Sequence, residues 1–157
     1  MNHTADDNPK PLVIGYGNPQ RSDDALGPIA AYQVGKRLPK GSIRILTIQQ
    51  LTPDLATEIS TASRVVFIDA TTEGQPGRIY HRRAQPNAAA NTPLGHHLTP
   101  EALLAITQAL HGKTPPAHVF SICAANLEFG DSLSDQVQNA VPLLVSMIIK
   151  TVAQPVS

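Results

Sequence analysis

Cysteine, tryptophan and charged residues are all scarce in this chain of 157 residues. The one cysteine, Cys123, excludes an internal disulfide framework and any metal site built from cysteines alone. Tryptophan is absent and aromatic residues make up 4% of the chain, which argues against a surface for stacking nucleic-acid bases. Charged residues make up 15%, and twelve Lys and Arg balance twelve Asp and Glu, so the basic field of a general nucleic-acid binder is missing. We therefore expect no nucleic-acid partner.

Long apolar runs are missing as well. The longest, residues 141–149, contains Pro142 and Ser146 and is far shorter than the ~20 residues of a membrane-spanning helix. Residues 1–11 are polar and lack the apolar segment of a signal peptide. With 41% hydrophobic residues, the chain has the composition and size of one globular domain. We expect a cytoplasmic monomer with no membrane partner, in which a flexible tail over residues 1–10 precedes a single domain over residues 11–157.

Short apolar runs alternate with helical patterns in the first half of the chain. Three runs rich in Ile, Val and Leu are typical of buried strands: residues 12–17, 42–48 and 64–70. A helix is expected over residues 26–38, and a second one starts at Thr52, with Thr52 as its cap and Pro53 in the first helical position. Strands separated by helices in this way form a parallel sheet with right-handed crossovers.

The second half departs from this pattern at one connection. Residues 71–77 are too few to hold a crossover helix, so the strand over residues 78–83 should run antiparallel. The remaining elements are a helix capped by Thr99, a strand over residues 118–123 and a helix that begins at Ser132 or Ser134. The sequence therefore predicts an α/β fold around a mixed sheet.

Acidic residues and histidines follow or precede these elements where chemistry is expected. In open α/β sheets, ligands bind beyond the carboxyl ends of the strands. Asp23 and Asp24 come after the first strand, Asp69 closes the third, and His96 and His97 precede the third helix. Two carboxylates and an imidazole suit a divalent transition metal.

Each of these residues also has an interpretation without chemistry. A carboxylate at position 23 or 24 could stabilise the positive end of the first helix dipole. Asp69 could accept hydrogen bonds from loop amides, and the two histidines could be ordinary surface residues. Residue type and spacing leave both interpretations open.

Other catalytic patterns are absent or incomplete. The segment Gly15-Tyr-Gly17 lacks the third glycine of a dinucleotide-binding loop, because Gln20 stands there. The chain has neither a Gly-Lys-Ser/Thr phosphate loop nor a Gly-x-Ser-x-Gly nucleophile turn. Cys123 falls in an expected strand and is assigned to packing. No role is assigned to three further histidines: His81, His111 and His118.

Three segments together resemble one known family. Gly15-Tyr-Gly-Asn-Pro-Gln-Arg-Ser-Asp-Asp-Ala-Leu-Gly27 resembles the opening motif of the nickel–iron hydrogenase maturation proteases, in which G-x-G-N is followed by paired acids and a glycine. Phe67-Ile-Asp69-Ala70 looks like the second acidic motif of that family, and Gly95-His96-His97-Leu98 looks like its histidine motif. The resemblance spans about residues 11 to 152.

The resemblance implies a fold, an activity and a metal. The fold would be a three-layer α/β/α sandwich around a five-stranded mixed sheet of order 2-1-3-5-4, with the fourth strand antiparallel. The activity would be that of a metal-dependent endopeptidase, which removes the C-terminal extension of the hydrogenase large-subunit precursor after nickel insertion. Carried over position by position, the Ni²⁺ ligands would be Asp24, Asp69 and His96, with the metal supplied or shared by the precursor. No individual catalytic residue is implied.

Departures from the family pattern and rival functions leave some choices open. Ala25 stands where many relatives carry glycine, and His97 leaves the choice of histidine ligand open. The metal could polarise the scissile carbonyl or lower the pKa of a bound water, or it could serve recognition only. One rival is a non-catalytic nickel-binding chaperone of the same fold. The other is a Mg²⁺-dependent signalling receiver domain that accepts a phosphoryl group on Asp69.

Overall fold

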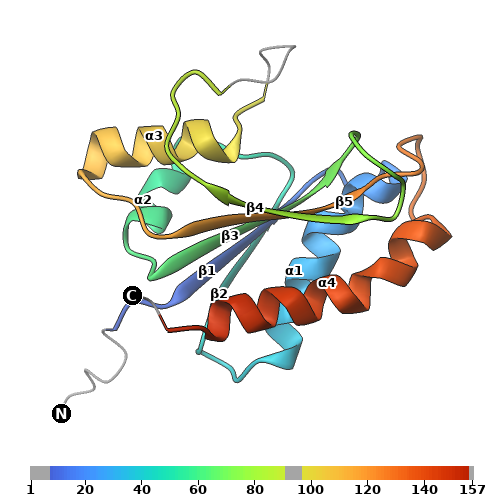
Figure 1. Cartoon of the computed structure of the whole chain (residues 1–157), viewed down its shortest axis with the longest axis horizontal. Helices are drawn as coiled ribbons and strands as arrows, with labels where there is room; N and C mark the ends of the chain where they lie inside the picture. The colour runs from blue at the N-terminus through green and yellow to red at the C-terminus, as the bar shows by residue number, and fades with distance from the viewer. Residues whose placement is uncertain (1–7, 91–96, 156–157) are drawn as a thin grey trace.

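The computed structural model describes residues 8–90 and 97–155, which form one five-stranded sheet with helices on both sides (Figure 1). The strand order is β2-β1-β3-β5-β4, in which β4 is antiparallel to β5 and the other neighbours are parallel. This order and this antiparallel strand confirm the expected fold class. The strands are β1 (Pro11–Tyr16), β2 (Arg44–Ile48), β3 (Arg64–Thr71), β4 (Ile79–Ala84) and β5 (Ala117–Cys123).

Within the described ranges, four α-helices make the two outer layers (Figure 1). One face of the sheet is covered by α1 and α4, and the other by α2 and α3. The helices are α1 (Leu26–Arg37), α2 (Leu55–Ser60), α3 (Pro100–His111) and α4 (Asp135–Ala153). In the described part of the chain, no helix combines the length and apolarity needed to cross a bilayer.

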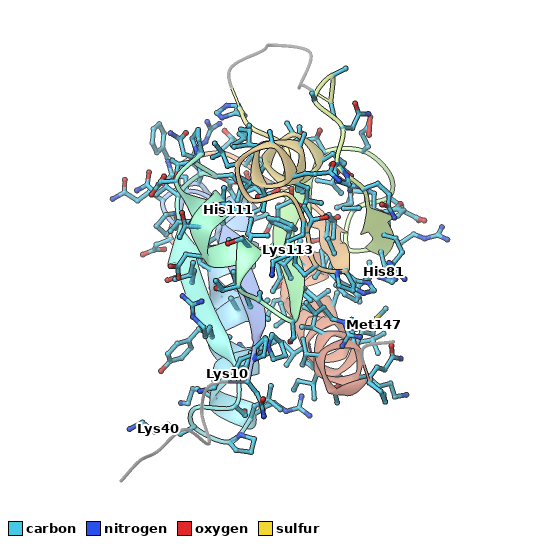
Figure 2. All side chains as sticks on the ribbon, turned by 90° about the vertical axis from the view of Figure 1, so that its left-hand side faces the viewer. Lys10, Lys40, His81, His111, Lys113 and Met147 are labelled. Atoms are coloured by element: carbon cyan, nitrogen blue, oxygen red, sulfur yellow. The ribbon has the colours of Figure 1, made fainter. Side chains whose placement is uncertain are left out.

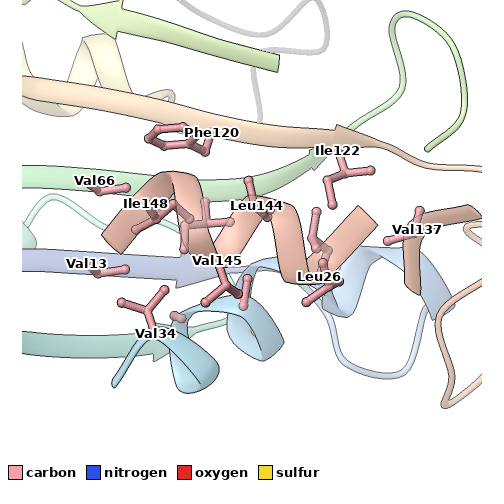
Figure 3. Close-up of a cluster of buried hydrophobic side chains, with 14 residues drawn as sticks. Val13, Leu26, Val34, Val66, Phe120, Ile122, Val137, Leu144, Val145 and Ile148 are labelled. Carbon is pink, nitrogen blue, oxygen red and sulfur yellow. The ribbon is translucent and has the colours of Figure 1, made fainter. Parts of the chain in front are cut away.

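Alternation along the strands sorts the apolar side chains into two cores. The side chains of Val13, Val66 and Phe120 lie on the α1 and α4 face, where Figure 3 shows them beneath the two helices. Leu12 and Phe67 lie on the opposite face beneath α2 and α3. All five are at most 1% exposed, and burying a side chain of this size contributes roughly 1.5–3 kcal/mol. A buried platform of this kind holds the strand ends in fixed positions.

β4 is an edge strand, and the short connection that leads to it explains its antiparallel direction but not its place beside β5. Residues 72–78 pass the end of β5. There the Gly77 N–H donates to the Cys123 carbonyl at 2.8 Å, and the Cys123 N–H donates to the Arg78 carbonyl. The chain then runs back along β5 as an antiparallel strand. A receiver domain has the all-parallel strand order 2-1-3-4-5, so this topology excludes that rival.

Helix starts agree with the sequence at α1, α3 and α4 and disagree at α2. Thr99 caps α3 by accepting from the Ala102 N–H at 3.1 Å, and Ser134 caps α4, as expected. The expected start at Thr52 is wrong, because residues 52–54 form a turn and α2 begins at Leu55. The Leu55 N–H bonds to the backbone carbonyl of Thr52, so this turn uses the backbone rather than the side-chain cap that the sequence suggested.

Candidate functional site

The chain folds back sharply after β1 and brings two acidic residues to the carboxyl edge of the sheet. The short 3-10 helix η2 (Ser22–Ala25) carries Asp23 and Asp24. Gly17, just after β1, has a φ of +148°, and a Cβ atom there would lie 1.9 Å from the Asp24 backbone oxygen. Only glycine therefore lets η2 lie against the end of β1.

Gly27 in the first turn of α1 contacts the sheet backbone directly. A Cβ atom at Gly27 would lie 2.4 Å from the carbonyl oxygen of Ile68 and 2.5 Å from that of Tyr16. Ile68 immediately precedes Asp69 in β3, and Asp24 lies less than one helical turn before Gly27. This contact therefore places the Asp24 turn beside the end of β3.

Asp69 lies near the end of β3 on the α2 and α3 face, where its environment changes its acidity. Burial raises its pKa to about 6, and the negative charges of Asp24 and Glu101 act in the same direction. A hydrogen bond from Tyr16 and the positive charge of Arg82 oppose this rise. The influence of Asp24 means that the two carboxylates, separated by 69 − 24 = 45 residues in sequence, are close in space.

One oxygen of each carboxylate accepts a hydrogen bond and the other does not. The Tyr16 hydroxyl donates to Asp69 Oδ2 at 2.8 Å, and the Asn18 N–H donates to Asp24 Oδ2 at 2.7 Å. Among the described residues, Oδ1 of neither aspartate has a hydrogen-bond partner. We call Asp24 and Asp69 the carboxylate pair. Two oriented carboxylates, each with an unengaged oxygen, offer two oxygen donors to a divalent cation, and a transition metal such as nickel would call for an imidazole beside them.

Asp23 has a different role from its neighbour. It is fully buried and accepts four hydrogen bonds: from the N–H groups of Ala125, Asn126 and Ser134, and from the Ser134 hydroxyl, at 2.7–2.9 Å. Burial alone would raise the pKa of Asp23, but these hydrogen bonds outweigh it and hold the pKa below its ordinary value. Asp23 therefore joins the acidic turn to the loop after β5 and has no oxygen left for a ligand.

The histidine prediction falls at the limit of the described residues. His96 lies outside them, so its assignment as a ligand stays a prediction. His97 is described and exposed, two residues before the Thr99 cap of α3. Among the described residues, no group of three His, Cys, Asp or Glu side chains is arranged to hold a metal ion. The carboxylate pair would therefore need its third ligand from residues 91–96 or from a bound substrate.

The start of α3 is joined to the edge of the sheet beside Asp69. Arg82 of β4 donates to both carboxylate oxygens of Glu101, at 2.9 and 3.1 Å. Both charges affect the pKa of Asp69, so the first turn of α3 lies near the carboxylate pair. The segment that contains both histidines leads directly into this turn.

The remaining chemical candidates pack on the opposite face or inside the sheet. His81 Nε2 and His118 Nδ1 are 2.9 Å apart, and the His81 ring stacks on Phe120. Burial, followed by His81 and Arg83, lowers the pKa of His118 to about 4, so the ring stays neutral at pH 7. Cys123 is 1% exposed, which confirms its assignment to packing.

A cavity of about 660 Å³ lies at the opposite, amino end of the sheet. Figure 2 faces this end and shows the side chains of Lys10, His111 and Lys113 there. None of the expected site residues lines it, and neither Asp nor Glu does among the described residues. Its positive lining separates it from the acidic chemistry at the carboxyl edge.

Sequence reasoning missed Tyr16 and the Arg82–Glu101 pair. A signal was present for Tyr16, since alternation places it on the same face as Leu12 and Ile14 and next to the strand that ends in Asp69. No signal links Arg82 to Glu101, because their contact depends on how α3 crosses the edge strand.

Comparisons with known proteins give a consistent result at the level of structure. No protein-family model matches the sequence, and no curated protein sequence matches it either. Among solved structures, the hydrogenase maturating endopeptidase HybD from E. coli is 18% identical with a TM-score of 0.72, and the match covers 90% of this chain and 91% of that one.

Two archaeal structures give similar values. The NiFe hydrogenase maturation protease HycI from Thermococcus kodakarensis KOD1 is 17% identical with a TM-score of 0.73, covering 97% of this chain and all (100%) of that one. The NiFe hydrogenase maturation protease HybD from Thermococcus kodakarensis is 23% identical with a TM-score of 0.68, covering 91% and 99%. The chain has the fold of these maturation proteases over nearly its full length.

Proposed function

We propose that this chain is a hydrogenase maturation protease, an endopeptidase that removes the C-terminal extension from the precursor of a nickel–iron hydrogenase large subunit. The carboxylate pair carries the proposal, because two sequence motifs far apart in the chain meet at one edge of the sheet with one unengaged oxygen each. The shared fold with proteins that are named as maturation proteases supports the same assignment.

In this proposal, nickel belongs to the precursor and the carboxylate pair recognises it. Asp24 and Asp69 would bind the metal through Oδ1, with His96 as the third ligand. Bound nickel would supply a Lewis acid close to the scissile peptide. Recognition of this kind makes cleavage wait for metal insertion, since a precursor without nickel offers the carboxylates no cation.

The protein's own groups do not suggest a covalent mechanism. Cys123 is buried, and its Sγ points to the backbone oxygen of Ala124, 3.7 Å away. A nucleophilic cysteine needs to be exposed to its substrate, and Cys123 is not. We therefore favour hydrolysis by water, with the carboxylate pair holding the metal-bearing end of the substrate.

The deciding experiment measures the mass of a nickel-loaded large-subunit precursor before and after incubation with the protein. We expect the precursor to lose a C-terminal peptide, and the same precursor without nickel to stay intact. A stoichiometric complex with no mass change would favour the nickel-binding chaperone instead. Absence of both binding and cleavage would overturn the proposed function.

Variants relate this result to the carboxylate pair. Asp24→Asn and Asp69→Asn keep the shape of each side chain and remove its charge, so both should abolish cleavage. Asp54→Asn is the matched control, since Asp54 is an exposed aspartate just before α2 and is not among the groups that shift the pKa of Asp69. Normal cleavage by either carboxylate-pair variant would show that the pair does not recognise the metal.

A further inference from the structure

Tyr16 is a polar side chain that contacts the carboxylate pair and to which the proposed function gives no role. It is the last residue of β1, on the same face as Leu12 and Ile14, which are fully buried beneath α2 and α3. Its ring packs against this core, so its position is set by the fold. Any large apolar residue would serve the strand and the core here, but only tyrosine adds a hydroxyl.

The register of the sheet directs that hydroxyl to Asp69. Gly15 of β1 pairs with Ile68 of β3, so the next residues along, Tyr16 and Asp69, lie side by side on one face. The Tyr16 hydroxyl donates to Asp69 Oδ2 at 2.8 Å.

We infer that Tyr16 is a positioning residue: its hydroxyl holds Asp69 Oδ2 and thereby fixes the rotamer in which Oδ1 is presented to the metal. The Asn18 N–H does the same for Asp24 at 2.7 Å, so each member of the carboxylate pair has one dedicated donor. Groups that orient a metal ligand in this way typically contribute 10–100-fold to metal affinity. The inference rests on the proposed function, because it assigns a metal to the carboxylate pair.

The test is Tyr16→Phe, which removes one oxygen atom and keeps the ring in the core. Calorimetric titration with Ni²⁺ alone should give a dissociation constant about 10- to 100-fold weaker than that of the wild-type protein. The visible absorption spectrum of bound Ni²⁺ should also change, since Asp69 would no longer hold a fixed orientation. Circular dichroism and the thermal midpoint, measured without metal, should stay close to wild type.

Tyr80→Phe is the matched control. Tyr80 is also a partly buried strand tyrosine, but its hydroxyl accepts from the Gln75 N–H at 3.1 Å and does not donate to Asp69. Its removal should leave the Ni²⁺ dissociation constant unchanged. In an Asp69→Asn background, Tyr16→Phe should cause no further loss, because the carboxylate that it orients is gone.

Each outcome decides one question. Equal Ni²⁺ affinity in Tyr16→Phe and wild type overturns the inference and leaves the proposed function intact. Absence of Ni²⁺ binding by the wild-type protein also overturns it, while cleavage of the nickel-loaded precursor, measured separately, decides the proposed function. An equal loss of affinity in Tyr80→Phe would overturn a role specific to Tyr16.

Discussion

Asp23 and Asp24 are identical in chemistry and adjacent in sequence, yet they belong to two different regions of the molecule. Asp23 faces the loop after β5, is fully buried and has both oxygens engaged. Asp24 faces the ends of β1 and β3, is partly exposed and has one oxygen engaged. The difference teaches that a carboxylate's role follows from how many of its acceptor positions the fold has already filled.

The geometry of η2 explains how neighbours come to face different regions. A 3-10 helix has about three residues per turn, so successive side chains point roughly 120° apart. Ser22 fixes the orientation of η2, because its N–H donates to the Gly130 carbonyl and its hydroxyl to the Glu128 carbonyl. Because η2 is held against the loop after β5, Asp23 points into that loop. Asp24 points toward the end of β3, where Asp69 lies.

Removing Asp23 should have the largest effect on the free energy of unfolding. Asp23→Ala removes a fully buried carboxylate that accepts from three backbone N–H groups, so the free energy of unfolding should fall by about 3 kcal/mol. Urea unfolding followed by circular dichroism measures this change. Asp54→Ala, at an exposed aspartate, should stay within about 0.5 kcal/mol of wild type. A loss below about 1 kcal/mol in Asp23→Ala would show that the loop is held by other contacts.

Removing the charge of Asp24 should give the opposite pattern, with little change in stability and a large loss of cleavage. Asp24→Asn keeps an oxygen that can accept from the Asn18 N–H, so the free energy of unfolding should change by less than about 1 kcal/mol. Cleavage of the nickel-loaded precursor should fall by about 100-fold or more, since a metal ligand matters at least as much as the groups that orient it. Quantitative mass spectrometry of the precursor gives the rate. A strongly destabilised variant would place Asp24 with Asp23 as a structural residue.

The comparison extends to a second pair of like side chains, His81 and His118. The pKa of His118 is lowered to about 4, below the ~6.5 of an unfolded histidine, so the unfolded state binds the proton first. The stability that the neutral ring contributes is therefore present above pH ~6.5 and is lost as the pH falls toward 4.

His118→Gln should flatten this pH dependence. Between pH 6.5 and 5, wild type should lose about 1 kcal/mol more free energy of unfolding than the variant. Arg83, Arg64 and His81 are the charged and titratable groups that affect His118, and all of them disfavour its protonation. Parallel pH curves for the two proteins would contradict the lowered pKa.

The smallest effect on the free energy of unfolding is expected at the ion pair between Arg82 and Glu101, which joins β4 to α3. Arg82 is half exposed, with 52% of its side chain accessible, so its ion pair with Glu101 should contribute less than about 1 kcal/mol. A double-mutant cycle with Arg82→Gln and Glu101→Gln isolates this coupling. A coupling well above 1 kcal/mol would mean that the pair is shielded from water far more than its exposure indicates.

The sequence predicted the elements better than the contacts between them. Apolar runs and turn residues located all five strands within a few residues, and the seven-residue connection correctly predicted the direction of β4. The start of α2 was wrong because Thr52 and Pro53 satisfy a backbone turn as well as they satisfy a helix cap.

The residues of the candidate site could be predicted from the sequence, but the role of each one could not. Three motifs in order indicated Asp24 and Asp69, and the structure brings these two together. Nothing in Asp23-Asp24 reveals which carboxylate the loop over residues 125–134 reaches, since that depends on tertiary contacts. Tyr16 was missed although alternation places it on the α2 and α3 face, because its hydroxyl bonds to a residue of another strand.

The close contact at Gly27 has a consequence for ion selection. Because no side chain separates the backbone of α1 from the carbonyl oxygens of Tyr16 and Ile68, the contact has no rotamers through which it could relax. The spacing between the Asp24 turn and Asp69 is therefore set by the helix and the sheet rather than by a flexible loop. A pair of donors with fixed spacing discriminates between ions of equal charge by their radius. In the proposed function, Gly27 would thus make the carboxylate pair selective for the radius of the ion that it binds.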